Sequence, residues 1–419
     1  MRLHPILAAL RRHKAGVVLI ALQIALTLAI VCNALFIIGQ RFQNINQPTG
    51  LTEDDLFLVS QQWVGAPSAD EPGGAEKLDA MMKEDLAALR NMPDVSSVTP
   101  TNSLPLFTSS RTGSVGINPG NGSYDGNSAG TARTSYFFLD EHGLATLGLK
   151  LVAGRYFDAG DVRHYSGREE RTPDMIVITK ALAEKMFPDK EAAGQVLYVD
   201  GSPRPSRVIG VVDRLQGAVW AKSFAWNAVV VAARQNNSYA RYAVRAKPGR
   251  RDAAMKAVPS LLYGINPMRV LDEETAVKSF AAIRDNAYRA DVGMAILMGA
   301  VCLILIGVTA AGIVGLTSFW VGQRRKQIGI RRALGAQKID ILRYFQLENF
   351  AIASGGAAAG IVLALALNFW LMREFGMDRI PVPWVIVGVA TVLLLGQFAV
   401  FVPARRASGV PPVVATRTI

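Results

Sequence analysis

The sequence predicts an α-helical membrane protein with four transmembrane helices and an α+β extracytoplasmic domain between the first and the second of them. Three observations support this fold class. Four long segments are apolar and nearly free of charge, a short basic segment separates the second from the third, and strand-like and helix-like patterns alternate between the first and the second. A helix needs about 20 consecutive apolar residues to cross the ~30 Å hydrocarbon core of a bilayer.

The apolar segments fix the predicted domain organisation. We expect a cytoplasmic amphipathic segment, a first transmembrane helix, a periplasmic α+β domain, a stalk continuing into the second transmembrane helix, a basic cytoplasmic loop, a third helix, a short periplasmic loop, a fourth helix and a cytoplasmic tail. In chain order these regions are residues 1–14, 15–39, 40–272, 273–321, 322–348, 349–371, 372–383, 384–402 and 403–419.

The first apolar segment is interpreted as an anchor and not as a cleaved signal peptide. Arg11, Arg12 and Lys14 precede it, as basic residues precede a signal peptide. The segment is nevertheless too long for such an apolar region, and it ends without a small-x-small cleavage site. Before it, apolar residues of 1–14 recur at helical spacing, which predicts a short amphipathic helix on the cytoplasmic face. A disordered basic flank is the open alternative there.

The charge distribution predicts the orientation in the membrane. The chain has a formal net charge of +12, and its basic residues concentrate in 1–14, 322–348 and 403–419. Because lysine and arginine are retained in cytoplasmic loops, we expect both termini and the basic loop on the cytoplasmic side of the membrane. The charge therefore indicates topology, and the expected partner is a lipid bilayer and not a nucleic acid.

Residues 40–272 alternate strand and helix signals, which predicts a mixed α+β domain. Strands are expected at 55–63, 175–178, 196–199, 207–212, 228–232, 239–245 and 268–271, and helices at 75–92, 179–186 and 250–262. The stretch 108–134 is rich in glycine, serine and asparagine, and 164–173 is strongly charged, so each is expected to be a loop.

Asp272 predicts the start of the stalk. It is a favourable helix cap, and Glu273 and Glu274 follow it in a first turn where acids are stabilising. No proline or glycine interrupts the chain before Gly293, so we expect a rigid helix that continues into the second span.

The sequence contains no recognisable nucleotide-binding, hydrolase or metal-binding motif. Gly143 and Gly148 have the glycine spacing of a nucleotide-binding loop, but Leu149 stands where the lysine belongs. No G-x-S-x-G or H-E-x-x-H run is present, and the four histidines are scattered. We therefore expect no enzyme activity, no metal and no cofactor in this chain.

Gly356 and Gly360 in the third apolar segment have the small-xxx-small spacing that lets helices approach closely. We expect them to mediate packing within the subunit. A seam between subunits is the alternative.

The basic loop and its surroundings resemble MacB/FtsX-type ABC transporter permeases. The resemblance begins with residues 324–343 (RRKQIGIRRALGAQKIDILR), which are similar to the cytoplasmic loop of that family. Residues 403–412 (PARRASGVPP) resemble the family's tail, and residues 144–157 (LATLGLKLVAGRYF) and 177–188 (VITKALAEKMFP) resemble its MacB-like periplasmic domain. The order of one span, a large outer domain and three spans extends the resemblance over the whole chain.

The resemblance implies that 322–348 is a coupling loop that docks on a cytoplasmic ABC ATPase, where ATP would bind. The residues implied in this contact are Gln327, Ile328, Gly329, Ile330, Arg331, Arg332, Leu334, Gly335 and Ala336. Ile328 and Ile330 are expected to fill a groove on the ATPase while the arginines pair with acids on its rim. Retention of charge in the cytoplasm is the alternative role of the arginines.

The sequence departs from the family pattern at two positions. Family loops usually carry an acid where this chain has Gln327, and family tails usually carry one near Val414. This difference suggests a dimer with a related permease, although a second copy of this chain is the other candidate partner. A periplasmic adaptor is a further candidate.

The predicted function is that of a permease subunit in an ABC-type export or mechanotransmission complex, which exports a peptide or drug-like substrate or handles lipoproteins. Two alternatives are an FtsX-like, non-transporting regulator of a cell-wall hydrolase and a membrane sensor or anchor without an ATPase.

Overall fold

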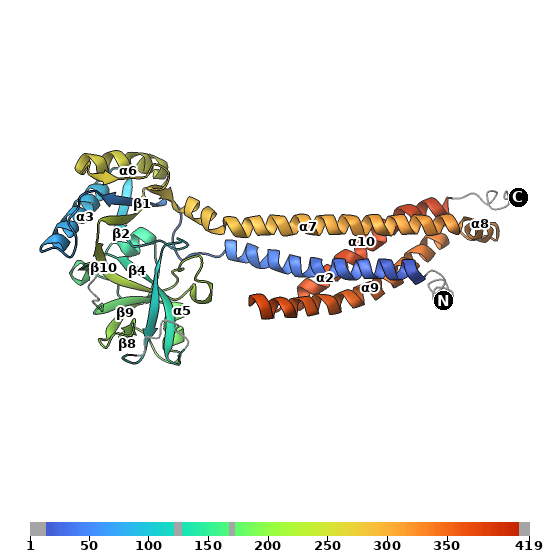
Figure 1. The fold of residues 1–419 in the computed structure, drawn as a ribbon, viewed down its shortest axis with the longest axis horizontal. Coiled ribbons are helices and arrows are strands. Elements are labelled where there is room, and N and C mark those ends of the chain that lie inside the picture. Colours follow the sequence, from blue (N-terminus) through green and yellow to red (C-terminus); the bar gives the residue numbers. More distant parts are fainter. Residues whose placement is uncertain (1–13, 121–127, 167–171, 410–419) are drawn as a thin grey trace. The chain divides into compact units, whose positions relative to one another are not determined.

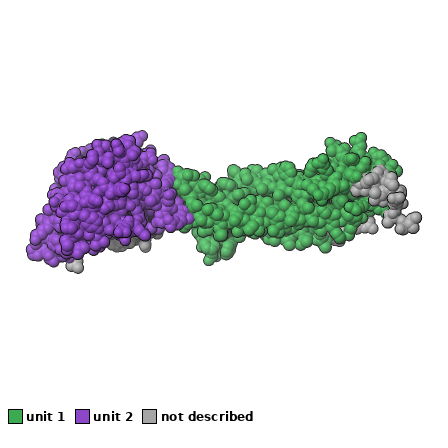
Figure 2. All heavy atoms as spheres, turned by 90° about the horizontal axis from the view of Figure 1, so that it is seen from above, with its two compact units in different colours: residues 1–46, 290–419 green, residues 47–289 purple. Residues whose placement is uncertain are grey.

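The computed structural model describes residues 14–120, 128–166 and 172–409, and the chain forms two compact units (Figures 1 and 2). Unit 1 contains Met1–Asn46 and Ala290–Ile419, and unit 2 contains Gln47–Arg289. The predicted amphipathic helix before Lys14 and the tail position Val414 lie outside the described residues.

Unit 1 is helical. Its elements are α2 (Lys14–Ile45), α7 (Phe280–Gln323, which begins in unit 2), α8 (Arg325–Ala333), α9 (Lys338–Phe375) and α10 (Val382–Ser408). Four of these helices, α2, α7, α9 and α10, are long and apolar enough to cross a membrane. Many of their large apolar side chains are exposed in the isolated chain, as expected for helices whose solvent is lipid.

Helix α2 contacts the other long helices through small residues. A Cβ atom at Gly356 of α9 would lie 2.8 Å from the Ala21 carbonyl oxygen, and one at Gly360 would lie 2.9 Å from the Leu28 side chain. On α10, Gly388 faces Cys32. The glycines therefore pack within the chain, against α2, where they let the helix backbones approach closely.

Hydrogen bonds between polar side chains connect the same helices. The hydroxyl groups of Thr27 in α2 and Thr309 in α7 lie 2.7 Å apart, and Asn33 Nδ2 donates to the Ala364 carbonyl of α9 at 3.1 Å. An unpaired polar group in hydrocarbon is costly, so these bonds favour one relative placement of the three helices.

The helices of unit 1 extend beyond the predicted spans. Helix α2 continues to Ile45, α9 begins at Lys338 inside the predicted loop 322–348, and α10 continues to Ser408 inside the predicted tail. The predicted spans end near the first charged or polar residues that flank each apolar segment. A helix continues past that point because its backbone hydrogen bonds do not depend on whether lipid or water surrounds it.

Unit 2 contains a five-stranded and an eight-stranded sheet. The first has the order β12-β1-β11-β2, with β13 also paired to β1, and α3 and α6 pack against it. These elements are β1 (Leu56–Trp63), β2 (Val95–Pro100), β11 (Tyr239–Ala246), β12 (Arg269–Val270), β13 (Val277–Ser279), α3 (Gly74–Arg90) and α6 (Arg251–Ile265). Its core alternates along β1 and β11, where Phe57, Val59, Tyr242 and Val244 point inward.

The eight-stranded sheet has the order β4-β3-β8-β9-β7-β10-β6, and a further β4–β10 pairing closes it into a ring. Its strands are β3 (Arg111–Gly116), β4 (Thr131–Leu139), β5 (Leu151–Gly154), β6 (Arg163–Ser166), β7 (Met175–Thr179), β8 (Val196–Val199), β9 (Ser206–Val212) and β10 (Ala228–Asn236). The short helices are α4 (Gly143–Leu147) and α5 (Lys180–Met186), with single turns at Ala159–Asp161 and Lys222–Phe224.

The prediction of a loop over 108–134 is wrong at the two ends of that stretch, where residues 111–116 of β3 and 131–134 of β4 form an antiparallel pair. Side chains of β4 form hydrogen bonds at this pair. Thr134 Oγ1 donates to the Asn227 carbonyl, and the Tyr136 hydroxyl donates to the Ser114 carbonyl. Similarly, β6 occupies the first residues of the predicted loop 164–173 and pairs with β10.

The long helix begins later than predicted, at Phe280 and not at residue 273. The Asp272 carboxylate accepts hydrogen bonds from the Thr275 backbone and hydroxyl and thereby closes a turn. Val277–Ser279 then pairs with β1 before the helix starts. The acidic cluster therefore marks a turn, because pairing with a distant strand displaces the helix start.

Among the described residues, two ion pairs link α3, which packs on the five-stranded sheet, to the eight-stranded sheet and the segment after β4. Asp79 of α3 binds Arg234 Nε of β10 at 2.7 Å, and Arg90 of α3 binds Asp140 at 2.6 Å. Burial acts to raise the pKa of Asp79, but hydrogen bonds and charge from Arg234 and Lys83 outweigh it and lower that pKa. The carboxylate is therefore charged at neutral pH and the sheets are held together.

We expect Gly356→Leu to lower the free energy of unfolding by about 1–3 kcal/mol, because the side chain would collide with α2. Gly355→Leu is the matched control, since a Cβ at Gly355 has no neighbour within 4 Å. Thermal unfolding in detergent measures both. Equal melting temperatures would contradict this packing.

A second prediction concerns the buried network of Asp85, Arg269 and Tyr242. Arg269 donates to both oxygens of Asp85 at 2.9 and 3.0 Å, and the Tyr242 hydroxyl donates at 2.9 Å. Asp85→Asn should destabilise unit 2 by about 3–5 kcal/mol, because the arginine keeps a buried charge without its counterion. Asp252→Asn, in the exposed pair with Arg251, should change stability by less than about 0.5 kcal/mol. Chemical denaturation of the full chain compares the two.

Candidate functional site

The candidate site is α8 with the turn that follows it. Gln327, Ile328, Gly329, Ile330, Arg331 and Arg332 lie on α8, and Leu334, Gly335 and Ala336 form the turn to α9. The helix ends because Gly335 adopts a φ of +96°, a conformation that costs a glycine little. The Gly335 and Ala336 amides then donate to the Arg332 and Arg331 carbonyls at 3.2 and 3.0 Å, which is a Schellman motif.

Helix α9, which follows this turn, begins with a defined cap. The Gln337 backbone amide donates to the Asp340 carboxylate at 2.9 Å, and both halves of a capping box are present at the start of α9. The sequence from Leu334 to Gln337 therefore fixes a tight, defined connection between the two helices.

The apolar residues of α8 point in two directions, which corrects one prediction. Ile328 is only 5% exposed and belongs to the core of unit 1, so it does not fill a groove on a partner. Ile330 is 49% exposed and Leu334 is 83% exposed. Because they are four residues apart, they present one apolar patch on the outer face of α8.

The arginines around α8 contact their own chain. Arg324 binds both oxygens of Glu348 in α9 at 2.9 and 3.1 Å, and both side chains are largely buried. Arg332 Nη1 donates to the Ser408 carbonyl at the end of α10, at 2.8 Å. These contacts hold α8 against α9 and α10.

Arg331 differs from these two arginines. Its guanidinium lies over the Tyr344 ring, 5.1 Å from the centroid, and the residue remains exposed. Gln327 is also exposed. The outer surface of α8 therefore combines the apolar patch of Ile330 and Leu334 with basic and polar side chains.

Sequence reasoning missed Glu348. It is the single acid between Asp340 and Glu374, and an acid in an apolar helix is a signal that it has a partner. The carbonyl of Ser408 carries no such signal, because a backbone acceptor looks the same in every residue. Among residues 14–120, 128–166 and 172–409, no group of three potential metal-ligating side chains is clustered.

Comparison with known families identifies the class. Residues 18–261 match the MacB-like periplasmic core domain, and residues 299–412 match the FtsX-like permease C-terminal domain. The first match covers more than half of the chain, and the chain belongs to the MacB/FtsX-like family of ABC transporter permeases. It is a multi-pass bacterial membrane protein with four candidate transmembrane helices and an α+β domain of periplasmic type between the first and second.

Relatives in this family are named as exporters. The chain is 25% identical over 387 residues to the pyoverdine export ATP-binding/permease protein PvdT of Pseudomonas savastanoi pv. phaseolicola, covering 90% of this chain and 53% of that protein. It is 29% identical over 358 residues to the macrolide export ATP-binding/permease protein MacB of Agrobacterium fabrum, covering 81% and 49%. The chain thus spans about half the length of the curated relatives it matches.

The periplasmic region of MacB from Actinobacillus actinomycetemcomitans is a similar solved structure, with 16% identity and a TM-score of 0.34 over 58% of this chain and 97% of that one. Both matched family models describe permease domains.

The Arg324–Glu348 pair gives a third prediction. Glu348→Gln should destabilise the helical unit by about 3 kcal/mol, because Arg324 keeps a buried, uncompensated charge. Replacing both residues by methionine should cost less than this single change, since neither charge is then buried. Thermal unfolding and the rate of tryptic cleavage in α8 report the result. A double methionine variant that loses as much stability as Glu348→Gln, or more, would contradict this coupling.

Proposed function

We propose that this chain is the permease subunit of an ABC-type export or mechanotransmission complex in a bacterial inner membrane, with both termini in the cytoplasm. One observation carries the proposal. Helix α8 is fixed between α7 and α9 in a chain of the MacB/FtsX-like family, and it presents Ile330 and Leu334 outward beside basic residues. This surface fits a protein partner that supplies an apolar groove with an acidic rim.

The partner in this proposal is a cytoplasmic ABC ATPase, which binds and hydrolyses the ATP. The chain itself carries no nucleotide-binding motif. Relatives named as ATP-binding/permease proteins combine the two functions in their names, and this chain covers about half the length of each. ATPase closure would bring two permeases together, and the second is a copy of this chain or a related permease.

Helix α7 would transmit the motion. Its 44 residues form one uninterrupted helix, about 66 Å long at 1.5 Å per residue. Phe280 at its start is fully buried, and Arg284 forms an ion pair with Glu53 of unit 2. At its other end, Gln323 is followed directly by Arg324 and α8. In this proposal a displacement of α8 is passed to the outer domain along the continuous chain of α7.

Export is the favoured outcome of this motion because relatives are named for pyoverdine and macrolide export. A peptide, a drug-like molecule or a lipoprotein is the corresponding substrate class, and a periplasmic adaptor would complete the route. The alternatives are an FtsX-like regulator of a cell-wall hydrolase and a sensor or anchor without an ATPase.

Purification of the tagged chain from its native membranes tests the proposal. We expect a near-stoichiometric ABC ATPase with the wild type, and at least a tenfold loss of it with the double change Ile330→Asp and Leu334→Asp, because charge replaces the apolar patch. Arg325→Ala, which removes an exposed charge from the first turn of α8, is the control and should retain most of the ATPase.

The same experiment separates the alternatives. A wild-type complex without any ATPase would overturn the proposal and favour the sensor or anchor. A cell-wall hydrolase bound together with the ATPase would favour the FtsX-like regulator. The presence or absence of a second, different permease would decide the symmetry of the dimer.

A further inference from the structure

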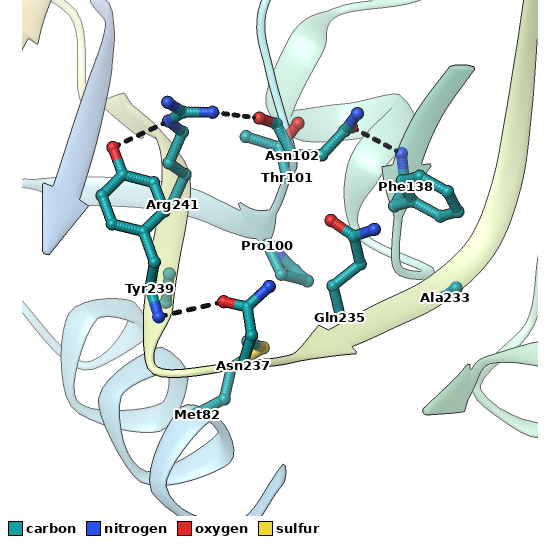
Figure 3. A pocket seen from close by; sticks show the side chains of 11 residues that line it. Met82, Pro100, Thr101, Asn102, Phe138, Ala233, Gln235, Asn237, Tyr239 and Arg241 are labelled. Atoms are coloured by element: carbon teal, nitrogen blue, oxygen red, sulfur yellow. Dashed lines mark hydrogen bonds between the residues drawn. The ribbon is translucent and has the colours of Figure 1, made fainter. Parts of the chain in front are cut away.

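A small cavity lies where the two sheets of unit 2 meet (Figure 3). Its walls come from β11 and the end of β2 in one sheet, from β4 and β10 in the other, and from α3. Its volume is about 60 Å³. Pockets for drug-sized ligands measure roughly 300–1,000 Å³, so this cavity is suited to one small polar group and not to a whole exported molecule.

Arg241 supplies a fixed positive charge at this cavity. Its guanidinium lies 5.0 Å from the ring centroid of Phe107 and 4.8 Å from that of Tyr239. Nη1 donates to the Asn102 carbonyl, and Nε donates to the Tyr239 hydroxyl at 3.2 Å. Within the described part of the chain, no carboxylate lies within ion-pair distance of Arg241. The arginine is therefore oriented in advance but lacks a counterion there.

Two side-chain amides add donors to the same space. Asn237 accepts the Tyr239 backbone amide through Oδ1 at 2.9 Å, which leaves its Nδ2 to donate. Gln235 forms no side-chain hydrogen bond with any described residue, and Figure 3 shows its amide in the middle of the cavity, between Pro100 and Phe138. Such a polar group in a confined site gains most from a partner that accepts hydrogen bonds.

The third amide of the cavity is already satisfied. Asn102 Nδ2 donates to the Tyr136 carbonyl at 2.9 Å, and its Oδ1 accepts from the Phe138 amide at 2.9 Å. Asn102 therefore joins the two sheets and does not serve a ligand. Met82, Pro100 and Phe138 line the remaining wall with apolar atoms.

We propose that this cavity binds a carboxylate group. Arg241 contributes the charge and a planar array of N–H donors that matches a carboxylate, and Gln235 and Asn237 contribute two neutral donors. A single cation and a volume of about 60 Å³ suit a monovalent group of two oxygens better than a phosphate. The carboxylate belongs either to a free small molecule or to an acidic side chain that a polypeptide inserts.

Binding of a carboxylate would join the sheets further. Arg241 belongs to β11 in one sheet, and Gln235 belongs to β10 in the other. A ligand held by both residues binds only when the sheets have this relative placement. It therefore stabilises the folded unit according to its concentration relative to the dissociation constant.

Titration calorimetry on the full chain in detergent tests this site, and it requires no ATPase. The probes are acetate and a capped glycine–serine peptide with one central glutamate, each compared with chloride or with the glutamine peptide at equal ionic strength. We expect saturable binding of at least one carboxylate probe. Tighter binding of the glutamate peptide identifies a polypeptide as the source, and equal or tighter binding of acetate identifies a small molecule.

The variants distinguish the cavity from the rest of the surface. Arg241→Gln should weaken binding at least tenfold. Gln235→Glu should abolish it and raise the melting temperature, because a carboxylate of the chain then occupies the site. Gln235 has no hydrogen-bonded side-chain partner among the described residues, so this variant keeps the fold even if the arginine variant does not.

Arg207→Gln removes an exposed arginine from β9 and serves as the control, with binding unchanged. The proposal is overturned if neither probe binds, or if the wild type and Gln235→Glu bind with the same dissociation constant.

Discussion

The close packing of α2 against α9 and α10, with α7 joined to α2 through side chains, is the constraint on which the helical unit depends. Lipid chains are as apolar as leucine, so burial of apolar surface cannot by itself bring helices together in a membrane. Here glycines such as Gly356 and Gly388 let the backbones approach, and bonds such as Thr27–Thr309 select one register. The position of α8 follows from this packing, because its anchors Glu348 and Ser408 lie on α9 and α10.

The sequence predicted the elements whose formation depends on neighbouring residues alone. The length of an apolar segment decides whether it crosses a bilayer, so the four long helices could be located from composition alone. The strand Val196–Val199 was also predicted with its observed bounds. Features that depend on distant segments were not accessible. Asp272 was predicted to cap a helix. It lies in a turn instead, because Val277–Ser279 pairs with β1 before the helix begins.

The candidate site also combines features set by neighbouring residues with features set by distant segments. The Leu-Gly-Ala-Gln sequence at 334–337 encodes its own geometry, because a helix end and a helix start both use neighbouring residues. Helical periodicity cannot state which face meets the rest of the chain. Ile328 and Ile330 are therefore equivalent in the sequence, and tertiary packing buries the first and exposes the second. Glu348 could be suspected from its apolar surroundings, but its partner Arg324 could not be assigned without knowing that the start of α8 lies beside α9.

The exposed surface of α8 limits which groups the proposed partner would have to supply. Arg324 and Arg332 are already engaged by the chain, so the charge available outward is smaller than the basic sequence suggests. Exposed charges chiefly accelerate encounter and orient it, whereas affinity comes from desolvated apolar anchors. Ile330 and Leu334 then determine how tightly a partner is held. Gln327, also exposed on α8, contributes no charge to that surface. The ATPase proposed as partner would therefore have to provide the acidic groups that meet the exposed Arg331.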